Sequence, residues 1–290
     1  MRNFIYLFLT SKIRKQMNYY KLYEIKDKIK ANSKKFYYNG SYTHLLAQHD
    51  KGYFTQLILI VKENLPVNSR ILDVGCGSGY SSYLLSKEGY YVVGLDLNPF
   101  PKKLKSKQSK RLQYRRGDAL HLPFKENSFD AVIFNDVIEH ITNVERCLLN
   151  AKRVLRPNGV LIILSPCLIT PFRPFVSFVR ILKGEKGIPV WGENLRTCVS
   201  NIFKFSLFLC HKVVLYCLGK VDFRYRLPDL KKAKNVGGDA DAVYWANPFE
   251  IITFLEQQNF KIIKKETSIL LGFKGSTRII AKKVMPYDTK

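Results

Sequence analysis

A glycine-rich turn at residues 73–79 (Asp-Val-Gly-Cys-Gly-Ser-Gly) carries the clearest chemical signal in the chain. It follows an apolar run that predicts a short buried strand, and it precedes a helix-compatible stretch, Tyr80 to Lys87, with Gly89 as its stop signal. Glycine permits the positive φ angles and the close backbone approach that a ligand-binding turn needs. The pattern departs from the dinucleotide fingerprint G-x-G-x-x-G, because Tyr80 stands where the last glycine belongs.

A carboxylate follows the next predicted strand. Asp96 comes directly after the apolar run Tyr91–Leu95, at the carboxyl edge where ligands bind in open α/β sheets. A carboxylate there can accept hydrogen bonds from both ribose hydroxyls of a nucleoside. Asp96 can also cap the following helix, and the two roles are compatible. Leu97 would then lie against the adenine ring.

The glycine-rich turn resembles motif I of the class I S-adenosylmethionine-dependent methyltransferases. Three further stretches extend the resemblance: G-D-A-x-x-L-P-F at 117–124, F-D-x-V at 129–132 with V-I-E-H at 137–140, and L-R-P-x-G at 155–159. The combination is similar to the small-molecule branch of that family (methyltransferase type 11), which includes ubiquinone and menaquinone methyltransferases. The resemblance covers about Arg70 to Ser165 and resumes near Asn247. Asn158 replaces the usual second glycine of a P-G-G turn, a neutral departure because asparagine tolerates left-handed φ angles.

This resemblance implies S-adenosyl-L-methionine as the cofactor. It also implies that Asp118, with Ala119 beside it, contacts the adenine amino group. The predicted cofactor-binding residues are Asp73, Gly75, Cys76, Gly77, Gly79, Asp96, Leu97, Asp118, Ala119 and Asn135.

The catalytic prediction rests on the turn after the fourth strand. Methyl transfer from a sulfonium is an in-line displacement, to which the protein contributes approach geometry and often a base. His140 can take a hydroxyl proton near neutral pH, so we predict His140 and Glu139 as catalytic, with His140 as the general base. The alternatives are that both ligate a divalent ion, or that they only cap and pack the turn. Tyr244 and Trp245 are predicted to contact the acceptor, and Asp239 and Asp241 are further candidates.

Strands alternate with helices through residues 70–165, which predicts an α/β fold with a parallel sheet and helices on both faces. The resemblance implies a Rossmann-like sheet of seven strands, mostly parallel, in the order 3-2-1-4-5-7-6 with an antiparallel edge hairpin. We expect a turn at 156–159 and the fifth strand at 160–165. Asn247, Pro248 and Glu250 predict a helix start, and the helix is expected to reach Gln258.

The chain divides into four predicted segments. These are a basic N-terminal extension (1–36), a methyltransferase core with cap helices (37–165), a helical insertion (166–242) and the end of the core (243–290). The insertion contains an apolar stretch, 199–221. This stretch is a poor membrane span, since Lys204 and Lys212 would each cost about 2.5–3.5 kcal/mol near the bilayer centre. We expect a helical hairpin that covers the substrate and touches a membrane with its outer face, or one that packs its apolar face on the core.

Composition limits the function classes. The 290 residues are 46% hydrophobic, which is enough for a core, and the formal net charge of +25 implies an anionic partner unless it is a lysine bias without function. The six cysteines show no C-x-x-C spacing, so we predict no zinc site and a cytoplasmic location. Base-amino methyltransferases carry Asn/Asp-Pro-Pro-Tyr/Phe where this chain has Asn135-Asp136-Val137-Ile138, which makes a nucleic-acid substrate less favoured.

Together these patterns predict a methyltransferase that acts on oxygen or carbon of a small or lipid-linked acceptor, quinone-like or glycolipid-like. The protein would sit peripherally at the inner, anionic membrane face. One alternative is an RNA methyltransferase, supported by the basic charge alone. The other is a non-catalytic cofactor-binding membrane scaffold.

Overall fold

The computed structural model describes residues 51–98, 100, 107–166, 171–188, 191–229, 239–267 and 276–284. The predicted N-terminal extension lies outside the described residues, as do parts of the insertion. The helices and strands are, in chain order, α4 (Lys51–Asn64), β1 (Arg70–Val74), α5 (Tyr80–Lys87), β2 (Tyr91–Asp96), β3 (Leu112–Arg116), β4 (Phe129–Asn135), η1 (Ile138–His140), α7 (Val144–Val154), β5 (Leu155–Pro166), α8 (Phe172–Leu182), α9 (Leu195–Cys217), η2 (Asp239–Asp241), α11 (Pro248–Gln257), β6 (Phe260–Thr267) and β7 (Ser276–Lys283), where η marks a 3-10 helix.

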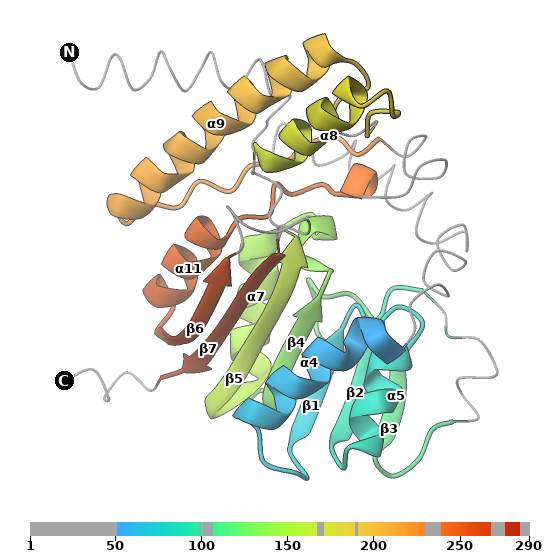
Figure 1. Cartoon of the computed structure of the whole chain (residues 1–290). Helices are drawn as coiled ribbons and strands as arrows, with labels where there is room; N and C mark the ends of the chain where they lie inside the picture. Colours follow the sequence, from blue (N-terminus) through green and yellow to red (C-terminus); the bar gives the residue numbers. More distant parts are fainter. Residues whose placement is uncertain are drawn as a thin grey trace.

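The strands form one seven-stranded sheet in the order β3-β2-β1-β4-β5-β7-β6 (Figure 1). The first five strands are parallel to their neighbours, and β7 runs antiparallel between β5 and β6. This order and the antiparallel edge hairpin confirm the predicted fold class. The strand order reverses at β1 and β4, which is where open α/β sheets bind ligands.

Alternate strand residues face two separate hydrophobic clusters. In β4, Ala131 and Ile133 pack with α4 and α5 on one face, whereas Val132 and Phe134 pack with α7 and α11 on the other. The alternation follows from the two-residue period of a strand. A parallel strand buried on both faces has a run of apolar residues, and β4 has one from Ala131 to Phe134. Helices therefore cover both faces, as the sequence predicts.

The helix ends match their predictions where the signals are local. Helix α5 ends at Lys87, and Gly89 follows with φ of 93°. Asn247 caps α11, since its side-chain oxygen accepts a hydrogen bond from the Glu250 N–H at 3.0 Å. Pro248 occupies the first turn of this helix, where its missing N–H costs no hydrogen bond.

The predicted turn at 156–159 is wrong. Strand β5 begins at Leu155, which pairs with Phe129 of β4, and the register shifts before Ala131 pairs with Val160. The irregularity places Asn158 at φ of 63°, a left-handed conformation that asparagine tolerates. Residues 156–159 thus form a bulge-like irregularity between two stretches that both pair with β4, and the chain does not leave the sheet.

Helices α8 and α9 pack against each other and lie beyond the carboxyl ends of the parallel strands (Figure 1). The Ser177 hydroxyl of α8 donates to the Gly192 carbonyl and accepts from the Ile188 N–H, which fixes α8 to the loop before α9. On α9, the ring of Phe205 packs edge-on against Trp245 at 5.2 Å between centroids. The two helices therefore sit over the edge of the sheet that carries the predicted site.

A buried ion pair joins α9 to the core. The Lys212 ammonium lies 2.6 Å from the Glu250 carboxylate of α11, and both side chains are 2% exposed. Lys212 also donates to the Asp222 carbonyl at 2.7 Å, and the same Glu250 oxygen accepts from the Asp222 N–H at 2.9 Å. Such a pair is costly to break, because removal of one partner leaves the other charge buried and unpaired.

We predict that Lys212→Met lowers the free energy of unfolding by about 3–5 kcal/mol, because it strands the Glu250 carboxylate in the interior. Urea unfolding followed by circular dichroism measures the change. Lys220→Met is the matched control, since Lys220 is exposed in the loop after α9. Equal losses for the two variants would contradict a stabilising role for the buried pair.

Candidate active site

The glycine-rich turn has the backbone geometry that its sequence predicts. Gly75, Gly77 and Gly79 have φ angles of 70°, 54° and 71°, which side chains with a Cβ rarely adopt. The Leu95 carbonyl of β2 accepts the N–H groups of Gly75 at 2.7 Å and of Cys76 at 3.1 Å. A Cβ on Gly79 would lie 2.5 Å from the ring of Tyr114 on β3. The turn is therefore held closely against β2 and β3.

Asp73 at the end of β1 is hydrogen-bonded to the start of α5. Its carboxylate is buried and accepts hydrogen bonds from the hydroxyls of Ser81 at 2.7 Å and Ser82 at 2.6 Å. Burial raises the pKa of Asp73 to about 6, and the two serine hydrogen bonds act in the opposite direction. The visible contacts of Asp73 thus shape the turn, and its predicted contact with a cofactor remains a prediction.

Asp96 faces the turn from the end of β2. Its Oδ2 accepts from the Gly77 N–H at 2.9 Å, and its Oδ1 accepts from the Asn98 N–H at 2.8 Å. Burial raises the pKa of Asp96, against the effect of these backbone hydrogen bonds. Oδ1 also accepts from the Asn98 side-chain amide at 3.2 Å, so the remaining acceptor capacity lies on Oδ2. This capacity fits a ribose hydroxyl of a nucleoside.

The other predicted cofactor residues lie at the same edge of the sheet. Asp118 is half-buried and accepts from the Leu120 N–H at 2.8 Å. Leu97 and Asn135, which follow β2 and end β4, are half-buried, whereas Ala119 and Cys76 are buried. These assignments stay predictions.

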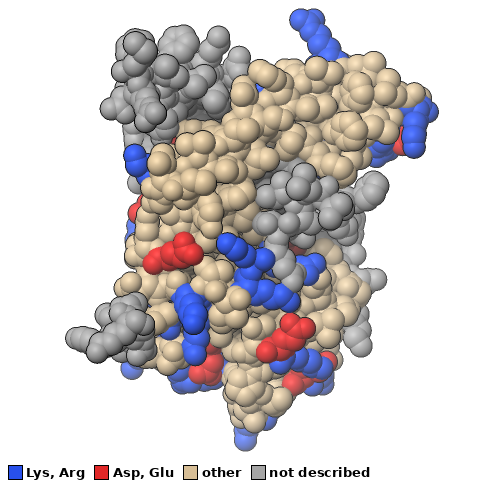
Figure 2. Space-filling view, turned by 60° about the vertical axis from the view of Figure 1, so that its left-hand side comes forward, with Lys and Arg blue, Asp and Glu red and all other residues tan. Residues whose placement is uncertain are grey.

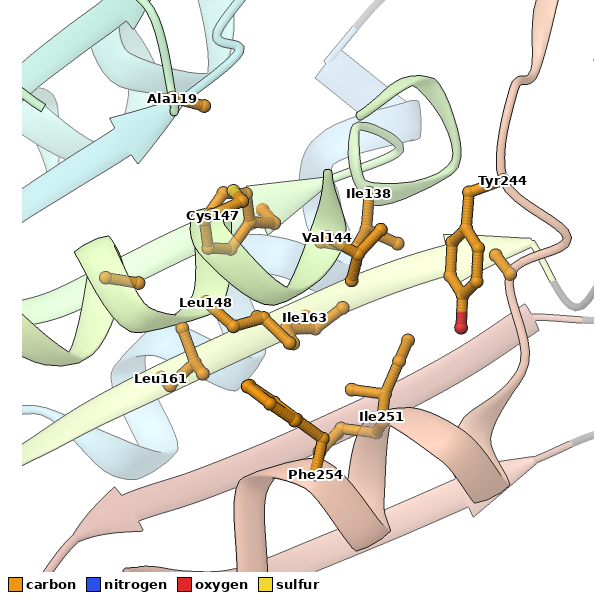
Figure 3. Close-up of a cluster of buried hydrophobic side chains, with 14 of the residues drawn as sticks. Ala119, Ile138, Val144, Cys147, Leu148, Leu161, Ile163, Tyr244, Ile251 and Phe254 are labelled. Carbon is orange, nitrogen blue, oxygen red and sulfur yellow. The ribbon is translucent and has the colours of Figure 1, made fainter. Parts of the chain in front are cut away.

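The turn that carries His140 packs directly on the glycine-rich turn. Val137 comes immediately before η1, and a Cβ on Gly75 would lie 2.6 Å from one of its methyl groups. Ile138 is fully buried beside Val144 of α7 and anchors η1 in the core (Figure 3). His140 therefore lies three residues along the chain from a side chain that packs on the predicted cofactor turn.

His140 lies between two carboxylates. Its Nδ1 is 3.3 Å from Oδ2 of Asp241 in η2, and its Nε2 is 3.8 Å from Oε1 of Glu139. The histidine side chain is 17% exposed, against 7% for Asp241 and 1% for Glu139. The sequence suggested Asp241 only as an acceptor contact, and no local signal links it to a histidine about a hundred positions earlier.

Glu139 holds three segments together. Its carboxylate accepts from the Ser165 hydroxyl at the end of β5 at 3.1 Å. Its backbone carbonyl accepts the N–H groups of Val243 at 2.8 Å and Tyr244 at 2.9 Å. With only 1% of its side chain exposed, Glu139 is placed to position His140 and the segment before α11.

The two predicted acceptor contacts differ in their surroundings. Tyr244 is fully buried, and its hydroxyl donates to Glu250 at 2.9 Å (Figure 3). Trp245 is 7% exposed and packs between Phe205 of α9 and the Arg226 guanidinium, which lies 4.6 Å from the ring centroid. Within the described residues, the indole N–H of Trp245 has no hydrogen-bond partner. Trp245 is thus better placed than Tyr244 for an acceptor.

The hydroxyl of Tyr53 on α4 hydrogen-bonds the Asp136 carboxylate after β4, a contact that the sequence did not predict. No cluster of three or more His, Cys, Asp or Glu side chains in the described part of the chain is arranged to hold a metal ion.

Surface hollows near Pro66, Arg111 and Arg156 lie at the opposite, amino-terminal edge of the parallel strands.

The sequence of this part of the chain is similar to that of known methyltransferases. A family model described as "Methyltransferase domain" matches residues 72–163. Demethylmenaquinone methyltransferase of Tropheryma whipplei is 33% identical over 117 residues, which cover 38% of this chain and 46% of that protein. Ubiquinone biosynthesis O-methyltransferase of Azorhizobium caulinodans is 37% identical over 128 residues, 42% of this chain and 48% of that protein. The chain thus spans about half the length of these curated relatives.

The fold also matches a solved structure. The 1,6-didemethyltoxoflavin-N1-methyltransferase of Burkholderia thailandensis, with bound 1,6-didemethyltoxoflavin and S-adenosylhomocysteine, aligns with a TM-score of 0.53 at 15% identity. The alignment covers 84% of this chain and 85% of that chain. At this identity the match shows a shared fold. The family model, which matches residues 72–163, confirms the predicted family resemblance over that part of the chain.

We predict that Asp73 makes stability fall as the pH rises. The unfolded chain releases this proton near pH 3.8, whereas the folded chain keeps it until about pH 6. The folded state therefore binds the extra proton between these values, and its free energy of unfolding drops by about 3 kcal/mol across the window. Asp73→Asn, whose amide oxygen still accepts from the serines, should remove this drop.

Urea unfolding at several pH values from about 4 to 7 measures the difference between the curves. Glu126→Gln serves as a control, because Glu126 is exposed. Parallel curves for wild type and Asp73→Asn would show that the buried carboxyl has no such effect.

Proposed function

We propose that this chain, whose residues 72–163 belong to the S-adenosylmethionine-dependent methyltransferase family, methylates oxygen or carbon of a small or lipid-linked acceptor. One observation carries the proposal. The turn that bears His140 packs through Val137 on Gly75 of the predicted cofactor turn. A base and a methyl donor would then share one edge of the sheet, as a displacement reaction requires.

The cofactor proposal rests on the turn and on Asp96. Gly75, Gly77 and Gly79, at every second position of the turn, have positive φ angles and let a ligand approach the backbone closely. Asp96 faces this turn and retains acceptor capacity for a ribose hydroxyl. S-adenosylmethionine, when bound, supplies an electrophilic methyl group on its sulfonium.

His140 is assigned the proton transfer. Asp241 faces Nδ1, which orients the imidazole and leaves Nε2 to accept a proton from an acceptor hydroxyl. The Glu139 carboxylate beside Nε2 stabilises the imidazolium that forms. In this proposal Glu139 and Asp241 are positioning residues, because both are almost fully buried.

The proposal for the acceptor rests on a group of aromatic side chains near the candidate site. Trp191, Phe205 and Trp245 form a contiguous aromatic group under α9. Aromatic side chains favour an apolar or ring-shaped acceptor, and the unpartnered Trp245 N–H can donate to an oxygen on it. The curated relatives act in menaquinone and ubiquinone synthesis by name. A quinone-like acceptor is therefore the first to test.

We expect Asp96→Asn to weaken S-adenosylmethionine binding at least about tenfold, since a charge-assisted hydrogen bond contributes roughly 1.5–3 kcal/mol. Isothermal titration calorimetry on the full chain measures the affinity. Glu63→Gln, an exposed substitution on α4, removes the same charge away from the site. Binding that is unaffected by Asp96→Asn would contradict the assignment of Asp96 to the ribose.

We expect His140→Ala to reduce methyl transfer about 100-fold or more while leaving cofactor affinity intact, because general base catalysis contributes roughly 10²–10⁴. Asp241→Asn should reduce transfer less. The assay follows labelled methyl groups from S-adenosylmethionine into a demethylmenaquinone-containing lipid extract, with the exposed Glu126→Ala as control.

Solvent partition of the label separates the candidate functions. Label in the organic phase supports the lipid or quinone acceptor, and label in RNA would replace it with an RNA methyltransferase. Cofactor binding without transfer to either pool would favour a non-catalytic scaffold. Full activity of His140→Ala on the true acceptor would overturn the base assignment.

A further inference from the structure

The outward face of α9 carries a stripe of exposed apolar side chains. They fall at Leu195, Val199 and Phe203 and again from Cys210 to Cys217, with the half-buried Ser206 and Leu207 between the two groups and the exposed Arg196, Thr197 and Ser200 beside the first. Phe203 is 63% exposed, Val199 54% and Leu218 57%. The outward stripe comprises Leu195, Val199, Phe203, Cys210, Val213, Val214, Cys217 and Leu218. On α8, Phe175 and Leu182 are also exposed.

The inward face of the same helix is mainly apolar, with Cys198, Phe205, Phe208 and Leu215 buried. The one charged residue among its buried positions, Lys212, pairs with Glu250 of α11. A helix that borders water has polar residues on its outer face, whereas the outer face of α9 has an apolar stripe. Figure 2 shows the result as a broad band with few charged residues across the upper part of the molecule, where α9 lies in Figure 1.

The charged residues of α9 and of the segment that follows it, up to Val221, are all basic. From Leu195 to Val221 the sequence contains no Asp or Glu. Basic side chains flank the two helices: Arg180, Lys183, Lys186, Arg196 and Lys220 are exposed, and Lys204 is half-buried. Glu185, which pairs with Arg180, and Glu193 are acidic residues in the connection between the helices. An apolar surface with a mainly basic border is complementary to the acyl and headgroup layers of an anionic bilayer.

We propose that α8 and α9 form a membrane-docking surface, which rests α9 flat in the headgroup region of an anionic lipid bilayer. The apolar stripe enters the acyl boundary, and the flanking lysines and arginines meet lipid phosphates. This lipid contact is independent of methyl transfer, since it needs neither cofactor nor acceptor.

The contacts of α9 with the core favour a flat orientation over a span. By length and composition α9 is the one described helix that could cross a membrane. Its inner side, however, is tied to the core by the Lys212–Glu250 pair and by the Phe205–Trp245 contact. Beyond its carboxyl end, the Gln257 side chain donates to the Gly219 carbonyl at 2.8 Å. A perpendicular span would break these contacts and strand a buried charge.

Docking in this orientation brings the bilayer close to the candidate site. Phe205 on the inner side of α9 touches Trp245, and the adjacent Tyr244 N–H hydrogen-bonds Glu139. The thickness of one helix, about 10 Å, therefore separates the lipid from the aromatic group of Trp191, Phe205 and Trp245. A lipid-linked acceptor would reach this group from the membrane side.

Vesicle co-sedimentation of the full chain tests the proposal. The probes are phosphatidylcholine vesicles with and without about 30 mol% phosphatidylglycerol. Wild type should bind the anionic vesicles at least about tenfold more tightly, and about 0.5 M salt should weaken that binding. Phe203→Glu with Val214→Glu should lose at least about tenfold in affinity, because the stripe then carries charges that both acyl chains and anionic headgroups disfavour.

Leu59→Glu with Ile263→Glu is the matched control, since both residues are about half exposed on other surfaces, on α4 and β6. Thermal unfolding shows that each variant is folded. Loss of lipid binding in the stripe variant alone supports the proposal. Equal binding by wild type and the stripe variant, or no preference for anionic vesicles, would overturn it. Retention on membranes after alkaline carbonate would overturn the flat orientation in favour of a span.

A second copy of the chain is the competing occupant of the stripe. Sedimentation equilibrium without lipid distinguishes it. A dimer that Phe203→Glu disrupts, in a protein that does not bind vesicles, would overturn the lipid proposal.

Discussion

The carboxylate of Glu250 is the point on which the insertion and the site both depend. It is buried at the start of α11 and accepts hydrogen bonds from the Lys212 ammonium, the Asp222 N–H and the Tyr244 hydroxyl. A buried carboxylate is tolerated only when its lone pairs are filled, so these groups cannot separate cheaply. Through Lys212 the carboxylate fixes α9, and through Tyr244 it fixes the segment that hydrogen-bonds to the turn of His140.

The candidate site is assembled from three pieces that are far apart in the sequence. β1 and α5 provide the glycine-rich turn, and the turn after β4 provides Glu139 and His140. The segment before α11 contributes Asp241 and Trp245. Steric contact joins the first two pieces, since Val137 fills the space beside Gly75 that a side chain would need. Hydrogen bonds from the third piece to the Glu139 carbonyl join it to the second. Rigid packing of this kind holds reacting groups within the narrow limits that catalysis requires.

The insertion exposes apolar side chains that a water-facing helix would bury. Its longest helix buries an ion pair and exposes an apolar stripe, and the whole chain carries a net charge of +25. Exposed apolar area costs free energy in water, and a large patch therefore usually marks a binding surface. The same helix contributes Phe205 to the aromatic group, so a partner on its outer face would lie one helix thickness from the proposed acceptor contact at Trp245.

Local patterns in the sequence determined the alternation of strands and helices, the glycine-rich turn, the end of α5 and the start of α11. Each depends on periodicity, on glycine conformation or on a cap within a few residues, and such signals act over short distances. The strand order was predicted from the family resemblance, because strand pairing joins residues that no local signal links. Only the tertiary structure decided the pairing of His140 with Asp241, the burial of Tyr244 and the ion pair of Lys212 with Glu250. It also decided that β5 begins at Leu155, because pairing with Phe129 outweighed a local turn signal. These contacts join residues distant in sequence, and their energies arise from desolvation and packing that exist only once the chain has folded.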